Sequence, residues 1–497
     1  MATFTRREFV RRSARLGAAA ALASQLEWLS ACGGTVKKAP SQADWARLGA
    51  RLKGTLVRPD DARYASLRLP FNRRYDYVHP QGIVVCAAPE DVSKSILWAR
   101  EHEVPVAVRS GGHSYAGYSV SDGLVVDMGR LRSVEVNERG GTVTIGPGAR
   151  NTDVYDGLQP HGVAFSAGRC PSVAISGLTL GGGFGFSSRR LGLSADALLE
   201  TDVVTASGET ITCSERVNSD LFWACRGGGG GNFGINTRFK FKTFPVDDVT
   251  LYDLSWAWRD ARTVLAALQQ VVSQAPDEWS LRVGLGSTGR PGATETTIEC
   301  LGQFFGPKRH LVTILDPVLS AARPIKKLIA KRTFWQAKTY FYDTTPFRRF
   351  AVKSNYVVKP LSEEAIHTIV ERVEQWPGSS NPLGAGVALF AWGGAISRVP
   401  PDATAFVHRE AMFLMAYDTD WTVDDPPALV SANVDWLHGL ADAIRPHVSQ
   451  QAYQNFIDRS QPDWHEAYYG GNFDRLVQVK KKYDPNNFFH FEQSIPT

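Results

Sequence analysis

Three glycine-rich segments constrain the fold of this 497-residue chain more than any other feature of its sequence. They read RSGGHSY at 109–115, GRCPSVAISGLTLGGGFG at 168–185 and RGGGGGNFGI at 226–235. Glycine has no Cβ, so such runs allow consecutive backbone N–H groups to converge on phosphate oxygens. The first segment matches neither the Rossmann nor the Walker pattern. Together the three segments indicate one extended, phosphate-bearing ligand that the chain surrounds.

The sequence around these segments predicts a mixture of helices and strands. Residues 89–103 begin with proline and carry apolar residues on one helical face. Short apolar runs bounded by turn residues predict strands at 104–108, 123–127 and 142–146. The first half of the chain is therefore neither all-α nor all-β.

A second α+β unit is predicted after Pro245. Residues 260–275 and 362–376 have apolar residues at helical spacing. Between and around these two helices lie β-like runs at 280–286 and 385–391. The stretch after Gln450 returns to short aromatic segments and a polar tail.

Charge and cysteine usage exclude two function classes. The formal charge is +5, but five arginines and two glutamates precede Cys32, so the rest of the chain is close to neutral. A balance this small predicts no nucleic-acid partner. The six cysteines show no CxxC spacing and no accompanying histidine pair, which predicts no metal site. Cys86, Cys213, Cys225 and Cys300 are either buried free thiols or contain a disulfide whose pairing the sequence does not choose.

The first 32 residues resemble an export signal. The pair Arg6-Arg7, followed by Phe9 and an alanine-rich apolar run at 16–23, is similar to a twin-arginine signal, which carries proteins already folded around a cofactor. The alternative is a basic amphipathic helix of the folded domain. Leu29-Ser-Ala-Cys32-Gly is similar to a lipoprotein cleavage box, with simple cleavage nearby as the alternative. We therefore expect a periplasmic or cell-surface protein, with Cys32 as its lipid anchor if lipidated.

The glycine-rich segments, extended to WACRGGGGGNFGI at 223–235, together with the ending YDPNNFFHFEQSIP, resemble the berberine bridge enzyme-like family of FAD-linked oxidases. The resemblance is strong over residues 70–245 and clear over 450–497. In between it is limited mainly to GGAISR at 393–398 and AFVHR at 405–409.

This resemblance implies an α+β fold of two domains: a vanillyl-alcohol oxidase, or PCMH-type, FAD-binding domain and a substrate domain with an antiparallel sheet and helices. We expect the FAD-binding domain at 45–245, with its PCMH-type core at about 76–245. The substrate domain is expected at 246–449, and a segment that returns to the FAD domain at 450–497.

The resemblance also implies how FAD is held. His113 matches the histidine that bonds the flavin 8α-methyl group, and Cys170 matches the cysteine that bonds flavin carbon 6. A thiolate is suited to attack on an electron-poor ring. The remaining cofactor-binding residues expected are Arg109, Ser110, Gly111, Gly112, Ser114, Val173, Gly177, Gly181, Gly182, Gly185, Ile235, Asn455 and Asn487.

Tyr453, in YQNF at 453–456, resembles the family tyrosine that lies over the flavin. We expect it to be the catalytic base, taking a hydroxyl proton while hydride passes to flavin N5; the alternative is a core tyrosine. Family members often support this base with a tyrosine or acidic residue just before the Gly-Gly of the middle domain. Here that position is Trp392, so the supporting group must come from elsewhere, with four candidates: Tyr340, Tyr342, Asp343 and Glu410.

The expected activity is oxidation of a hydroxyl group on a carbohydrate or secondary metabolite. Val173 matches the family position thought to control oxygen access, and a small β-branched residue there favours O2 as the electron acceptor. The alternatives are a dehydrogenase that uses a quinone or protein acceptor, and a non-catalytic flavoprotein. Tyr453 argues against the last.

Overall fold

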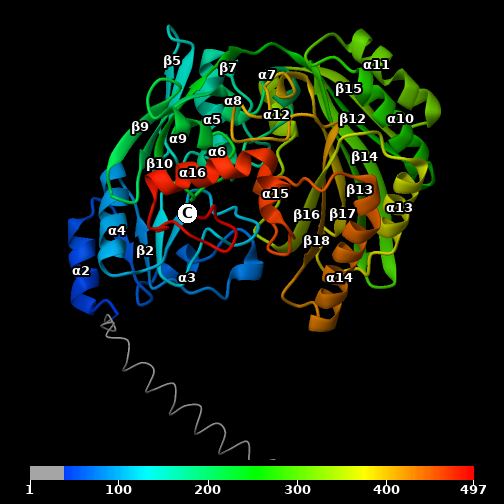
Figure 1. Ribbon diagram of the computed structural model, residues 1–497. Helices are drawn as coiled ribbons and strands as arrows, with labels where there is room; N and C mark the ends of the chain where they lie inside the picture. Colours follow the sequence, from blue (N-terminus) through cyan, green and yellow to red (C-terminus); the bar gives the residue numbers. More distant parts are fainter. Residues whose placement is uncertain (1–38) are drawn as a thin grey trace, which may run out of the picture. The chain divides into compact units, whose positions relative to one another are not determined.

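The computed structural model describes residues 39–497, so the predicted export signal and Cys32 lie outside the described residues (Figure 1). Contacts between residues divide the chain at Ala46, and Arg47–Thr497 forms one compact unit. Within residues 39–497, no helix combines the length and apolar character needed to cross a membrane.

The N-terminal part of this unit contains a four-stranded sheet in the order β1-β2-β4-β3. Strands β2, β4 and β3 are parallel, and β1 is antiparallel to β2. The predicted helix at 89–103 is confirmed as α4, with Pro89 in its first turn. The bounds are β1 Thr55–Val57, β2 Gly82–Val85, β3 Val106–Arg109, β4 Leu124–Asp127, α2 Gln42–Arg51, α3 Tyr64–Leu67 and α4 Pro89–Glu101.

A five-stranded antiparallel sheet follows, in the order β5-β6-β10-β8-β9, with the small pair β7 and β11 beside it. The strands of the sheet are β5 Val134–Asn137, β6 Thr142–Ile145, β8 Leu198–Val204, β9 Thr210–Ser214 and β10 Ile235–Lys242. The pair consists of β7 Val163–Ala164 and β11 Phe244–Pro245. Its helices are α5 Asn151–Leu158, α6 Ile175–Leu180, α7 Ser188–Leu191, α8 Ser194–Ala197 and α9 Ser219–Ala224.

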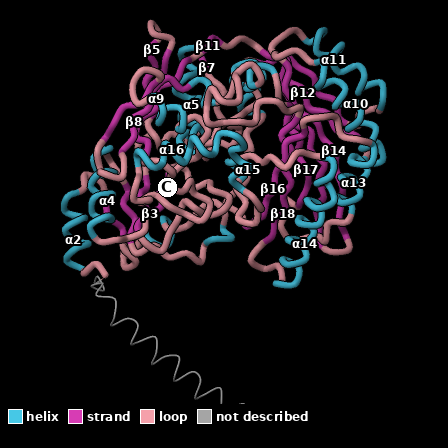
Figure 2. Tube along the Cα trace, viewed as in Figure 1, coloured by secondary structure: helices cyan, strands magenta, loops and turns pink. Residues whose placement is uncertain are grey.

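The middle region is built on a seven-stranded antiparallel sheet, in the order β15-β12-β14-β13-β17-β18-β16. Helices α10, α11, α13 and α14 pack on one face of this sheet and share its hydrophobic core (Figures 1 and 2). The strands are β12 Val249–Trp256, β13 Trp279–Arg290, β14 Ala293–Phe304, β15 Lys326–Arg332, β16 Arg349–Val357, β17 Ala385–Ala391 and β18 Phe413–Trp421. The helices are α10 Ala261–Gln274, α11 Lys308–Ala321, α12 Phe334–Tyr340, α13 Glu363–Glu374 and α14 Pro427–Ile444.

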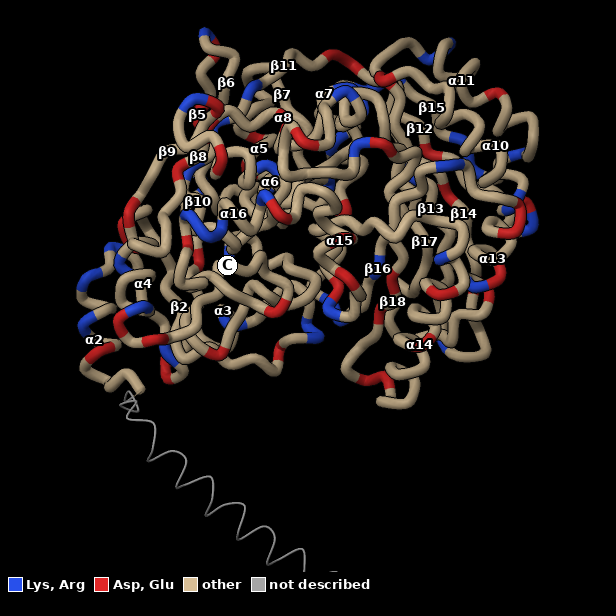
Figure 3. Tube along the Cα trace, in the orientation of Figure 1, with Lys and Arg blue, Asp and Glu red and all other residues tan. Residues whose placement is uncertain are grey.

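This architecture confirms the predicted α+β fold with an antiparallel sheet and helices in its second half. The helices predicted at 260–275 and 362–376 are α10 and α13, and the predicted β-like runs lie in β13 and β17. Lys and Arg, and likewise Asp and Glu, are spread over both halves of the described chain (Figure 3).

The C-terminal segment returns to the N-terminal half through α15 (Trp464–Tyr469) and α16 (Phe473–Tyr483), as Figure 1 shows in red. The sequence pattern after Gln450 predicted only short aromatic segments and a polar tail, and it did not predict α16. The buried Lys480 ammonium donates to the Asn232 carbonyl at 2.7 Å, the Asp484 carboxylate at 2.7 Å and the Phe489 carbonyl at 2.5 Å. These bonds join α16 to the third glycine-rich segment.

Two fully buried arginines connect the middle region to the glycine-rich half. Arg409 binds Asp196 through two N–H···O bonds of 2.9 Å, and it donates to the Phe406 carbonyl and Thr404 hydroxyl. Arg189, on α7, donates only to backbone carbonyls of the middle region, among them Trp279 at 2.8 Å and Ala275 at 2.9 Å. The two halves are thus held together by charged donors whose bonds are protected from water.

We expect Arg409→Met to lower the free energy of unfolding by roughly 3–5 kcal/mol, because it leaves the Asp196 carboxylate buried without its partner. Arg398→Met is the matched control, since Arg398 is 62% exposed and its ion pair with Asp277 should contribute less than about 1 kcal/mol. Denaturant titration of both variants measures the difference. Equal losses in the two variants would contradict the assignment.

Candidate active site

A cavity of about 320 Å³ lies where the glycine-rich segments meet the C-terminal segment. Its volume lies in the range of pockets that hold cofactors and small ligands, roughly 300–1,000 Å³. Its walls come from residues in the stretches 105–121, 168–184, 230–236, 453–457 and 489–491. Segments separated by more than 300 residues therefore share one wall.

Most of the predicted site residues line this cavity. They are Ser110, Gly111, Gly112, His113, Ser114, Cys170, Val173, Gly177, Ile235, Tyr453 and Asn455. Five others do not reach its wall: Arg109, Gly181, Gly182, Gly185 and Asn487.

Four of those five pack directly behind the wall. Arg109 pairs with Asp127 on the neighbouring strand at 2.7 Å. A Cβ on Gly181 would lie 2.2 Å from the Asn455 Oδ1 atom, and one on Gly185 would lie 2.2 Å from the Ala167 carbonyl. Gly182 has φ +106° and lies against the Phe406 ring. These glycines allow close packing of the chain on itself.

The His113 imidazole is half-buried, and its lowered pKa keeps it neutral. Burial, reinforced by the Arg150 charge, lowers the pKa of His113 to about 3. Its ring stacks on Phe71 at 3.9 Å, and its Nε2 atom lies 3.0 Å from the Ser172 hydroxyl. A neutral imidazole has a free lone pair, which is the form required for bond formation to carbon. Neither Phe71 nor Ser172 was predicted; Ser172 adjoins Cys170 in the second motif, whereas Phe71 carries no sequence signal.

The Cys170 thiol lies beside an ion pair. Burial raises the pKa of Cys170 to about 11, although the Arg169 guanidinium opposes this shift. Asp343 lies 3.8 Å from the sulfur atom and 3.0 Å from Arg169. Burial alone would raise the pKa of Asp343, but Arg169 and Thr345 together lower it to about 2. Asp343, one of the candidates for supporting the base, therefore lies beside Cys170.

The Tyr453 hydroxyl is buried and accepts two hydrogen bonds. The Gly183 backbone N–H and the Asn455 side-chain amide both donate to its oxygen at 3.1 Å. Asn455 also donates to the Leu178 carbonyl at 2.9 Å, which orients its amide. Burial raises the pKa of Tyr453 to about 12, and the two donors oppose that shift. Both donors would stabilise a negative charge on the phenol oxygen.

An aromatic cluster surrounds Tyr453. The rings of Phe184 and Phe456 lie 5.5 and 5.0 Å from it, and Trp392 belongs to the same buried cluster. Trp392 donates its indole N–H to the His408 carbonyl at 2.9 Å. The cluster also contains Tyr356, which the sequence reasoning missed and whose hydroxyl has no partner within residues 39–497.

The remaining candidates for supporting the base point elsewhere. The Tyr340 hydroxyl donates to Asp253, and Glu410 is exposed. Lys338 lies over the Tyr342 ring at 4.5 Å. In the described chain, hydrogen bonds to the Tyr453 hydroxyl come from Gly183 and Asn455 instead.

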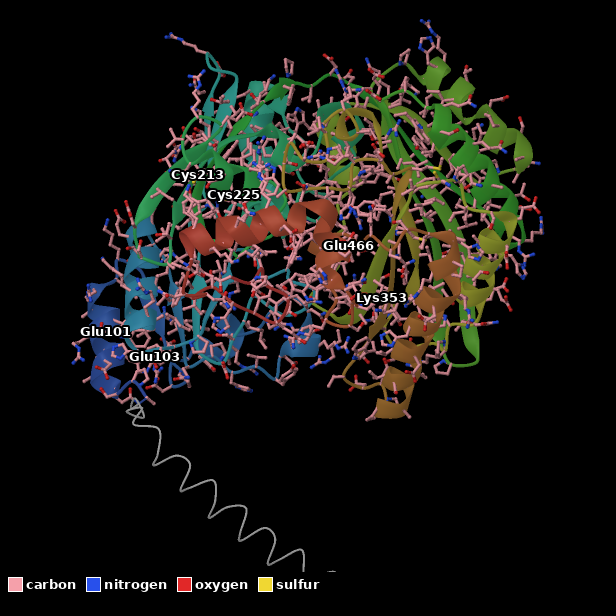
Figure 4. The ribbon with its side chains drawn as sticks, viewed as in Figure 1. Glu101, Glu103, Cys213, Cys225, Lys353 and Glu466 are labelled. Carbon is pink, nitrogen blue, oxygen red and sulfur yellow. The ribbon has the colours of Figure 1, made fainter. Side chains whose placement is uncertain are left out.

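The described cysteines other than Cys170 are buried free thiols: Cys86, Cys213, Cys225 and Cys300. Cys213 and Cys225, labelled in Figure 4, come from β9 and the end of α9. Residues 39–497 contain no group of His, Cys, Asp and Glu that could hold a metal ion. The structure therefore supports free thiols, and not a disulfide, for these four cysteines.

This fold and cavity define a two-domain FAD-binding oxidoreductase of the PCMH type. Residues 80–214 match the FAD binding domain family, and residues 452–496 match the family "Berberine and berberine like". The FAD-linked oxidoreductase YgaK of Bacillus subtilis is 36% identical over 455 residues, covering 90% of this chain and 97% of that protein. The chain belongs to the berberine bridge enzyme-like family of FAD-linked oxidoreductases.

Other relatives agree with this assignment. Xylooligosaccharide oxidase from Thermothelomyces thermophilus is 32% identical, over 86% of this chain and 89% of that protein. The solved structure of wild-type Physcomitrella patens BBE-like 1 superposes with a TM-score of 0.83 at 29% identity, covering 91% of this chain and 99% of that one.

The cavity residues fit FAD. Ser176 and Gln454 line the cavity, and each has a buried side-chain oxygen without a partner in residues 39–497. Such atoms in a native fold call for a polar ligand. A Cβ on Gly177 would meet nothing within 4 Å, so this helical glycine leaves open space on the cavity side of α6.

We expect Gly177→Ala to leave the melting temperature unchanged or slightly raised, because alanine favours a helix, yet to lower the flavin content of the purified protein. Gly439→Ala is the matched control, since Gly439 is also helical, has its nearest neighbour atom at 3.8 Å and lies outside the cavity. Visible absorbance per polypeptide measures the flavin content. Normal flavin content in Gly177→Ala would show that α6 does not border the cofactor.

Proposed function

We propose that this enzyme oxidises a hydroxyl-bearing carbon of a carbohydrate or secondary metabolite, with Tyr453 as the base and covalently bound FAD as the hydride acceptor. One observation carries the proposal: the Tyr453 oxygen lies on the cavity wall and accepts two N–H bonds of 3.1 Å. A phenol held in this way can accept a proton after ionisation, because both donors stabilise the phenolate.

FAD supplies a two-electron acceptor at the cavity. Tyr453 takes the substrate's hydroxyl proton at its phenol oxygen while hydride leaves the carbinol carbon. The Phe184 and Phe456 rings flank Tyr453 and exclude water from it. Asn455 and the Gly183 N–H hold the phenol oxygen in position through the proton transfer.

His113 and Cys170 are proposed as the two covalent attachment points for FAD. Both line the cavity, and the neutral imidazole of His113 is suited to bond formation. The Arg169 guanidinium beside Cys170 stabilises the thiolate. Two tethers would retain a cofactor that an exported protein cannot readily replace.

The names of the relatives support a hydroxyl-bearing substrate. They include a xylooligosaccharide oxidase, a glucooligosaccharide oxidase and a monolignol oxidoreductase. Val173, on the cavity wall, supports O2 as the acceptor, and a dehydrogenase that uses a quinone or protein acceptor is the second candidate.

The proposal also includes export by the twin-arginine route, with lipidation of Cys32 or cleavage nearby. The mass of the mature N-terminus tests this part of the proposal.

We expect Tyr453→Phe to lower kcat by roughly 10²–10⁴-fold while the protein keeps its flavin, because the variant loses only the base. Since burial raises the pKa of Tyr453 to about 12, the ionised fraction and therefore kcat/KM of the wild-type enzyme should rise with increasing pH. The variant should lose this dependence.

Tyr356→Phe, which removes an unpaired hydroxyl from the same cluster, is the control. It should change kcat less than fivefold, a change worth about 1 kcal/mol. A wild-type pH profile in Tyr453→Phe would exclude Tyr453 as the base.

We expect the wild-type polypeptide to stay yellow after acid precipitation and to carry the mass of one FAD. His113→Ala and Cys170→Ala should each keep a single attachment, and the double variant should release all its flavin. Cys225→Ala, which removes a buried thiol that does not line the cavity, should behave as wild type. A colourless wild-type precipitate would refute covalent attachment.

We expect turnover of sugars or aromatic alcohols to release one equivalent of hydrogen peroxide per product. Peroxide measured against a panel of oligosaccharides and cinnamyl-type alcohols identifies both substrate and acceptor. Turnover with an added quinone but without peroxide would favour the dehydrogenase. Binding without turnover under both conditions would indicate a non-catalytic flavoprotein.

A further inference from the structure

A second pocket, of about 290 Å³, lies apart from the residues that line the flavin cavity. Its walls come from the turn at 74–77, from β16, from α14 and from residues 458–460. Lys353, which projects from β16 and is labelled in Figure 4, belongs to it. The pocket is therefore built from both halves of the chain.

The base of this pocket is a preorganised polar network. The Lys353 ammonium donates to the Asp458 carboxylate at 2.6 Å and to the Ser460 hydroxyl at 2.8 Å. Ser460 in turn donates to Asp458 through its backbone N–H at 3.0 Å. Lys353 and Asp458 are only 12% and 18% exposed, so their charges neutralise each other within the pocket.

The rim carries positive charge held by aromatic rings. The Arg459 guanidinium lies 4.9 Å from the rings of both Tyr75 and Tyr118. The Arg74 guanidinium lies 5.6 Å from the Trp421 ring, and no described carboxylate forms an ion pair with it. The Arg459 Nε atom donates to the Ala116 carbonyl at 2.9 Å, and its Nη1 atom lies 3.7 Å from Glu492, which is 59% exposed. The aromatic rings, and for Arg459 also the Ala116 carbonyl, therefore position the two guanidinium groups. The donors of Arg74 and the terminal nitrogens of Arg459 remain available to a ligand.

We propose that this pocket binds a small anion, a carboxylate or phosphate borne on a sugar-sized body. Guanidinium groups pair with carboxylate and phosphate oxygens in a bidentate geometry, and Arg74 and Arg459 provide two of them. His438 adds a further nitrogen donor. The Tyr77 ring, 64% exposed at the edge, offers a face for the ligand's body. This site goes beyond the proposed oxidation and does not depend on it.

The pocket is also connected to the flavin cavity through two neighbouring residues. Ser354, which follows Lys353 on β16, accepts a hydrogen bond from the Tyr453 backbone N–H at 3.0 Å. Ile457, which precedes Asp458, lines the flavin cavity. Lys353 at the base of the pocket is thus next in sequence to Ser354, which holds the Tyr453 backbone, and Arg459 lies two residues after Ile457.

Isothermal titration of the flavin-loaded full chain with gluconate and with inorganic phosphate tests the proposal. We expect one site for an anion, and weaker binding as salt is added. Gluconate bound more tightly than phosphate assigns the site to sugar acids, and the reverse order assigns it to phosphates.

Two variants test the location of the site. Arg74→Gln with Arg459→Gln should weaken anion binding at least tenfold, and Arg74→Gln alone should weaken it measurably without disturbing a buried contact. Arg259→Gln is the matched control, since Arg259 is 86% exposed and lies outside the pocket. Absence of anion binding to the wild-type chain, or unchanged binding in both pocket variants, would overturn the proposal, as would binding that added salt does not weaken.

Discussion

The buried Arg409–Asp196 ion pair is the interaction on which the geometry of the cavity depends. Asp196 belongs to α8 in the glycine-rich half, and Arg409 ends the loop that follows β17 in the middle region. By holding this loop in place, the pair positions Phe406 against Gly182 and Gly227. A Cβ added at Gly182 would collide with the Phe406 ring, and one added at Gly227 would collide with the Phe406 backbone. Glycine in the second and third segments therefore serves packing between the halves as much as contact with a ligand.

Burial is the largest cause of the pKa shifts of the three candidate reactive side chains. It lowers the pKa of His113, which keeps the imidazole neutral, and it raises the pKa values of Cys170 and Tyr453. Neutral groups suit a cavity that must admit the uncharged isoalloxazine ring of oxidised FAD. Each group whose proposed reaction needs an anion has a partner that opposes the effect of burial on its pKa: Arg169 beside Cys170, and two N–H donors at Tyr453.

Sequence reasoning succeeded where the signal was local. The proline at the start of α4 and the apolar stripes of α10 and α13 are patterns contained within each helix's own short sequence. It missed α16, whose buried side chains are few and lie among charged residues, and Lys480 shows why: an ammonium placed in the core is intelligible only with its three acceptors present. Asp343 was named as a candidate, but its place beside Cys170 depends on a loop 173 residues away.

The amino-acid sequence by itself determined the class of fold and the cofactor, and it named His113, Cys170 and Tyr453 as candidate site residues. It could do so because the glycine runs and these three residues occur in motifs of a few neighbouring positions. Only the tertiary structure decided which of these residues line the same cavity wall and which glycines pack behind that wall. It also decided which side chains surround Tyr453, given that Trp392 stands where family members often have an acidic residue or a tyrosine. The physical reason is that burial, hydrogen bonding and pKa depend on segments hundreds of residues apart, whose meeting no local pattern encodes.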